Sequence, residues 1–139
     1  MYNPTRDQVR DFFFETWRKY RAGLPLVGIE NLGLDVIFQH AEYHGFLNED
    51  QNKARDFTDE GNPFLHMSLH LALEEQLSID QPPGVRRRFE ALLAKKGDRH
   101  DALHEAIECL AEMMWRSQKD KAPPDAGLYL ECLEKRGRG

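Results

Sequence analysis

Apolar residues recur along this chain three or four positions apart, which is the spacing of helices with one buried face. The pattern predicts helices over about residues 4–22, 26–44, 63–79, 85–96 and 99–118, with a last short helix after residue 124. The alternating pattern of strands is absent from the sequence. We therefore expect an all-α fold, with a four-helix-bundle core and two additional short helices, in a single domain spanning residues 1–139.

The residues between these stretches are typical of helix ends. Asn3-Pro4 and Asn62-Pro63 have a capping residue followed by a proline suited to the first turn. Gly45 and Gly97 are expected to end helices, and Asp98 is expected to cap the next one. Residues 46–61 are polar and irregular, and we expect a long loop there that acts as a lid over the site described next.

The histidines form the strongest chemical signal in the chain. All 6 occur in pairs four residues apart. Residues at this spacing share one face of a helix, where two imidazoles can bind one metal ion. The pairs are His40/His44, His66/His70 and His100/His104.

Two of the pairs continue, at the same spacing, to a carboxylate. Glu74 follows His70, and Glu108 follows His104. If successive long helices run antiparallel, all three pairs lie in one layer at one end of the bundle. Inward-facing histidine and glutamate in a bundle core are typical of di-iron proteins.

This ligand set predicts a transition-metal site. Imidazole binds zinc, iron, copper, nickel and cobalt, and added carboxylate favours iron, manganese or zinc. Six imidazoles and two carboxylates exceed the needs of one ion, so we expect a non-haem dinuclear centre. Two iron ions, or iron with manganese, would serve redox or oxygen chemistry there. Tyr43 is then a candidate proton or electron donor, and Arg99 a candidate partner for an anionic ligand.

Three alternatives stay open. One zinc or nickel ion in a hydrolase or transferase would activate water, with Glu74 or Glu108 as general base. A structural, storage or sensing metal module would need no catalysis. Haem between two histidines is disfavoured, because carboxylates on the same stripe suit haem iron poorly.

Composition limits the classes of partner that the protein can have. The net charge of −5 argues against nucleic-acid binding. The sequence contains neither an apolar run of transmembrane length nor a signal-peptide pattern, so we expect a cytoplasmic protein without a membrane partner. Cys109 and Cys132 are expected to be reduced thiols, and Trp17 and Trp115 to be core residues. A homodimer is compatible with a small bundle.

Several segments together resemble a small proteobacterial family defined only by a domain of unknown function. The segments are Asn62-Pro63-Phe64-Leu65-His66, the run from Leu69 to Gly84, and Asp98-Arg99-His100. The resemblance covers nearly the whole chain and implies a bacterial cytoplasmic protein, with no assigned activity. The ligand set is also similar to that of hemerythrin-like di-iron bundles, although the first predicted helix here has no histidine.

Overall fold

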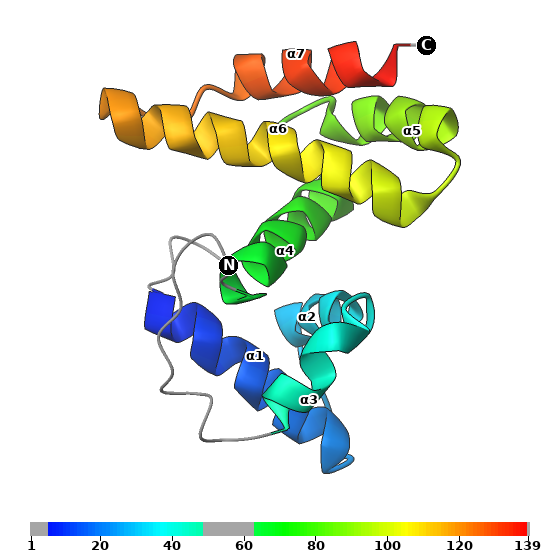
Figure 1. Ribbon diagram of the computed structural model, residues 1–139, viewed down its shortest axis with the longest axis vertical. Helices are drawn as coiled ribbons and strands as arrows, with labels where there is room; N and C mark the ends of the chain where they lie inside the picture. Colours follow the sequence, from blue (N-terminus) through cyan, green and yellow to red (C-terminus); the bar gives the residue numbers. More distant parts are fainter. Residues whose placement is uncertain (1–5, 49–62, 139) are drawn as a thin grey trace. The chain divides into compact units, whose positions relative to one another are not determined.

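A computed structural model describes residues 6–48 and 63–138 of the chain, and helices are the only regular elements in this part (Figure 1). The elements are α1 (Arg6–Arg21), α2 (Ile29–Phe38), the 3-10 helix η1 (Ala41–Tyr43), α3 (His44–Leu47), α4 (Pro63–Ile79), α5 (Val85–Lys96), α6 (Arg99–Asp120) and α7 (Ala126–Gly137). The predicted all-α class is confirmed.

The chain divides into two compact units, Met1–Leu71 and Ala72–Gly139. Helix α4 contributes its first half to the first unit and its second half to the second. The predicted four-helix core is not confirmed, and the single domain over residues 1–139 stays a prediction. Asn3-Pro4 and Asn62 lie outside the described residues.

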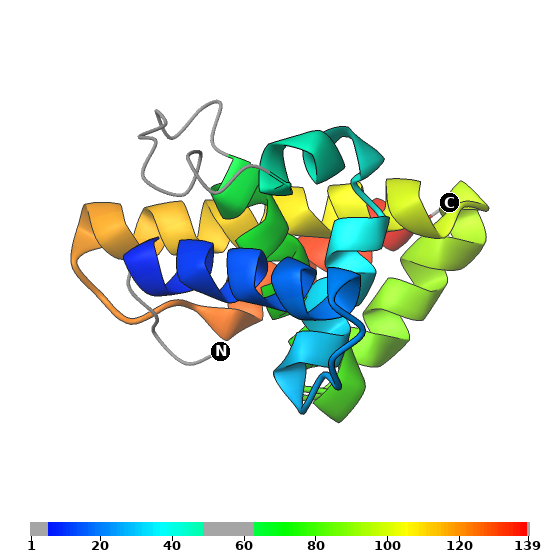
Figure 2. The same cartoon turned by 90° about the horizontal axis from the view of Figure 1, so that it is seen from below.

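Helices α1 and α2 of the first unit pack against one another (Figure 2). Its buried core consists of Phe13, Phe14, Trp17, Val36, Ile37, Leu47, Phe64, Met67 and Leu71. The prediction that Trp17 is a core residue is confirmed. Gly33 allows α2 to approach α1 closely, because a Cβ at this position would lie 2.7 Å from the Phe12 ring.

The second unit packs α5, α6 and α7 side by side, with α7 lying over the other two in Figure 1. Leu92, Leu103 and Leu133 are among the fully buried residues of its core. The predicted helix ends are confirmed here. Gly97 ends α5 with a φ of 74°, and the Asp98 carboxylate accepts a hydrogen bond from the His100 backbone N–H at 3.2 Å.

Two expectations about the second unit are wrong. Cys109 and Cys132 are joined by a disulfide bond between α6 and α7 rather than remaining separate thiols. Trp115 is 58% exposed, not a core residue, and Met114 beside it is 42% exposed. The last turns of α6 keep the helical periodicity, but within their own unit no element covers these two side chains.

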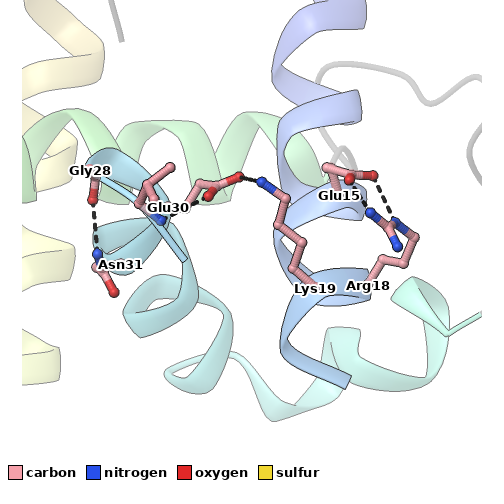
Figure 3. Close-up of polar contacts among 7 residues, drawn as sticks. Glu15, Arg18, Lys19, Gly28, Glu30 and Asn31 are labelled. Carbon is pink, nitrogen blue, oxygen red and sulfur yellow. Dashed lines mark hydrogen bonds and ion pairs between the residues drawn. The ribbon is translucent and has the colours of Figure 1, made fainter. Parts of the chain in front are cut away.

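An ion pair in the first unit joins α1 to the start of α2 (Figure 3). The Lys19 Nζ lies 2.7 Å from one oxygen of Glu30, and the Val27 N–H donates to the other oxygen at 3.0 Å. These contacts stabilise the ionised form, so the pKa of Glu30 is lowered, first by Lys19 and then by Val27. A lowered pKa means that the interaction stabilises the folded state at neutral pH. This stabilisation is lost as the pH falls through that pKa.

Replacing Gly33 by alanine tests the close approach of α1 and α2. Alanine normally favours a helix by about 1 kcal/mol over glycine. Here the added methyl group meets Phe12, and we expect the free energy of unfolding to fall by about 1–3 kcal/mol. Denaturant unfolding measures the change. The control is Gly45→Ala in α3, where no atom lies within 4 Å of the added Cβ and no loss is expected. Equal stability of both variants would contradict the packing described.

Replacing Lys19 by methionine tests the ion pair with Glu30. We expect the pKa of Glu30 to rise, because its strongest stabilising partner is removed. A carboxyl-detected NMR titration follows this residue directly. Lys119→Met, in the other unit, is the control and should leave the pKa of Glu30 unchanged. A Glu30 titration that is the same in Lys19→Met and in the unmodified chain would refute the role of Lys19.

Candidate metal centre

The segment that contains His40 does not continue α2 as the sequence pattern predicts. Helix α2 ends at Phe38, and His40 has a φ of −127° and a ψ of 66°, outside the helical region. The His40 Nδ1 lies 2.7 Å from the carbonyl oxygen of Val36, and the His44 Nε2 lies 2.8 Å from that of Ile37. The same two carbonyls also accept shorter-range bonds from the backbone N–H groups of Gln39, at 3.2 Å, and His40, at 3.0 Å, and the helix ends there.

His66 and His70 behave as their spacing predicts. Both lie on α4, one turn apart, and their Nε2 atoms are 3.2 Å from one another. His70 is fully buried, and His66 is partly buried. A neutral imidazole has one N–H and one lone pair, so two ring nitrogens this close need a proton or a cation between them.

The His40 ring completes a cluster with these two. Its centroid lies 4.8 Å from the His66 ring and 4.4 Å from the His70 ring. One ligand nitrogen from each of the three lies within 4.8 Å of the others. Nitrogens bound to one tetrahedral ion at about 2.0–2.1 Å are about 3.3 Å apart, so the three side chains would have to move closer together to bind one ion. We call these three residues the histidine cluster.

The contact of His40 with a backbone carbonyl identifies which of its nitrogens can act as an acceptor. A carbonyl oxygen only accepts hydrogen bonds, so Nδ1 donates to Val36 and the lone pair is on Nε2. A backbone carbonyl that orients a histidine in this way is the usual outer-shell partner of a metal ligand. Sequence reasoning missed Val36. The available signal was a histidine four residues after an apolar residue at a helix end.

Tyr43 lies against the His40 ring. The two rings are stacked, with centroids 5.5 Å apart and an interplanar angle of 8°. Burial raises the pKa of the Tyr43 hydroxyl, and the nearby Glu42 adds to the shift, so the phenol stays protonated at neutral pH. The role of Tyr43 as a proton or electron donor stays a prediction.

His44 is not part of the histidine cluster, and its expected pairing with His40 on one helix face is wrong. Its ring packs on Trp17 at 4.6 Å, and its Nε2 bonds the Ile37 carbonyl. The break after Phe38 is the reason, because residues four apart share a face only in a continuous helix. We therefore assign His44 a structural role at the end of α2.

His100 and His104 do lie together in the second unit. They are one turn apart on α6, and their ring centroids are 4.2 Å from one another. Both are partly buried. The prediction that this pair shares ions with the other histidines stays a prediction.

Both predicted carboxylate ligands have cationic partners. The two oxygens of Glu74 lie 3.0 and 3.1 Å from the two terminal nitrogens of Arg99. Arg99 also lies over the Phe89 ring, 5.9 Å from its centroid. Glu108 is paired with Arg136 and is 65% exposed, so its expected place on the buried stripe of α6 is wrong. The guanidinium groups compete with any cation for both carboxylates.

Two further expectations depend on other parts of the chain. The predicted lid falls mostly on residues 49–61, outside the described residues. Phe46 and Leu47, at its start, are helical. Among the described helices, none combines the length and the apolar character that crossing a membrane requires.

The fold and the cluster define a helical protein with a buried set of histidines. Residues 5–135 match the family described as Domain of unknown function (DUF1841), and the chain belongs to this family. The resemblance to a family of unknown function is thereby confirmed. Comparison with the curated proteins gave no match, and comparison with the solved structures gave none either.

The tautomers of His40 and His44 test the geometry of this segment. In metal-free protein, we expect the neutral form of each ring to have its proton on Nδ1 of His40 and on Nε2 of His44. Nitrogen-correlated NMR of the side chains distinguishes the two forms. His44 is an internal control, because it is expected to be the opposite tautomer. A proton on Nε2 of His40 would contradict the contact with Val36.

Proposed function

We propose that this chain is a metal-binding protein and that His40, His66 and His70 hold one transition-metal ion. The observation that supports the proposal is the approach of three imidazole rings, two of them fully buried, with ring centroids 4.4–4.8 Å apart. Buried polar rings are costly unless their nitrogens have partners, and a shared cation satisfies all three at once.

The number of ligands favours a site with open positions. Structural zinc sites usually have four protein ligands, whereas catalytic sites usually have three and bind water or substrate in the remaining place. Zinc, iron, nickel and cobalt all suit three imidazoles. An ion at this site would supply a Lewis acid or an activated water, and the Tyr43 ring stacks on one of the residues that would hold it.

The dinuclear iron centre expected from the ligand count is the second candidate. It needs the pair His100/His104 and at least one carboxylate in addition to the histidine cluster. The ion pairs of Glu74 with Arg99 and of Glu108 with Arg136 favour the mononuclear site, since these carboxylates must leave a cation to become ligands. The observation that supports a second ion is the contact between the His100 and His104 rings on α6.

Metal content is the test of the proposal. Protein purified without an affinity tag should contain about one equivalent of a first-row transition metal by elemental analysis. His66→Gln should weaken metal binding by more than about 100-fold, because loss of an outer-shell partner alone weakens it by about 10–100-fold. His66 is only partly buried, so this variant is expected to fold. Full occupancy in His66→Gln and in His70→Gln would overturn the proposal.

Two matched variants separate the candidates. His44→Gln keeps a side-chain donor for Ile37 and should bind metal normally. His100→Gln/His104→Gln tests the third pair. Loss of one of two equivalents in this double variant would indicate a second ion. Unchanged content at one equivalent would support the site built from the histidine cluster alone.

A further inference from the structure

A cavity of about 310 Å³ lies between α6 and α7 in the second unit, and the disulfide bond forms part of its wall. Met113, Leu128 and Tyr129 supply apolar surface in it. The two sulfurs differ in access. Cys109 is 1% exposed, whereas Cys132 is partly exposed. A small molecule that enters the cavity therefore meets the disulfide from the side of Cys132.

Charged side chains surround the same cavity. Lys135 and Arg136 lie three and four residues after Cys132, on the same face of α7. Helix α6 contributes Arg116 to the lining. Two carboxylates face these cations. Glu131 pairs with Lys135 at 3.1 Å, and Glu112 pairs with Arg116 at 3.1 Å. Arg136, the third cation, pairs with Glu105 and Glu108, so every cation of the lining has a carboxylate partner, and access rather than charge distinguishes the two sulfurs.

We propose that Cys109 and Cys132 form a redox-active pair that exchanges with small thiols, and that Cys132 is the sulfur that reacts. A thiolate enters the cavity and attacks Sγ of Cys132. A sulfur–sulfur bond forms between the two, the Cys109–Cys132 bond breaks, and its electron pair leaves on Cys109, which takes a proton. A second thiolate then attacks the sulfur of the bound small molecule. Cys132 is released as a thiolate, and the small thiols leave as their own disulfide. The net change is two-electron reduction of the protein and oxidation of two thiols.

The unit has the contacts to stay folded when this bond is broken. The Tyr129 hydroxyl donates to Gln76 at 2.6 Å. Arg136 lies 2.6 Å from Glu105, and the Lys95 Nζ lies 2.6 Å from the carbonyl oxygen of Arg138. These contacts tie α7 to α4, α5 and α6 independently of the disulfide. The bond is therefore placed to change chemically without loss of the fold, as a redox site requires.

The test compares two single-thiol variants. Cys109→Ser leaves only Cys132, and Cys132→Ser leaves only Cys109. With oxidised glutathione in native buffer, we expect Cys132 to form the mixed disulfide at least about tenfold faster than Cys109, because the buried thiol is shielded. Intact-mass spectrometry follows the reaction, and the rates in denaturant, expected to be equal, serve as the control. Equal native rates, or a faster reaction of Cys109, would overturn the proposal.

A measurement on the unmodified chain covers the case in which a variant fails to fold. Native protein is treated with reduced glutathione, quenched with acid, alkylated and mapped by peptide mass spectrometry. We expect glutathione on Cys132 and the alkyl group on Cys109. Glutathione on Cys109, or a disulfide that resists reduction until the protein unfolds, would overturn the proposal. Neither result depends on the metal site, so the two proposals succeed or fail separately.

Discussion

Three imidazole rings packed against one another inside the first unit are the constraint on which the account of function depends. Each ring has a polar nitrogen that a buried environment penalises unless it is bonded. The Nε2 atoms of His66 and His70 are 3.2 Å apart, and the His40 ring lies against both. A proton or a cation between them satisfies both nitrogens. The proposal is that this shared group is a transition-metal ion, which imidazole binds well.

The chain reaches this geometry by two different routes. His66 and His70 are brought together by helix periodicity alone, because α4 is continuous through both. His40 joins the histidine cluster for a different reason, because helix α2 ends before it. Once α2 ends at Phe38, His40 bonds back to Val36, and its ring lies against His66 and His70 on α4. A longer α2 would have kept His40 and His44 on one face, as the sequence pattern suggested.

Local patterns therefore predicted much of the fold and part of the site. The spans of α4, α5 and α6 follow from periodicity, Gly97 and the Asp98 cap, all of which act within a few residues. The end of α2 was not predictable in this way, since side-chain bonds to carbonyls compete with the helix there. Partners distant in sequence were missed as well. The disulfide joins cysteines 23 residues apart, and the ring of His44 packs on Trp17, 27 positions earlier.

The two proposed sites use different chemistry in different units. The histidine cluster has nitrogen ligands, and the cysteines are held in a disulfide rather than offered as thiolates. X-ray absorption spectroscopy of the metal-loaded protein addresses the central claim most directly, because it reports the atoms bound to the ion. The account predicts three imidazole nitrogens from the histidine cluster at about 2.0–2.1 Å from the ion, and no sulfur bound to it. A spectrum showing sulfur ligands, or only oxygen at longer distances, would contradict it.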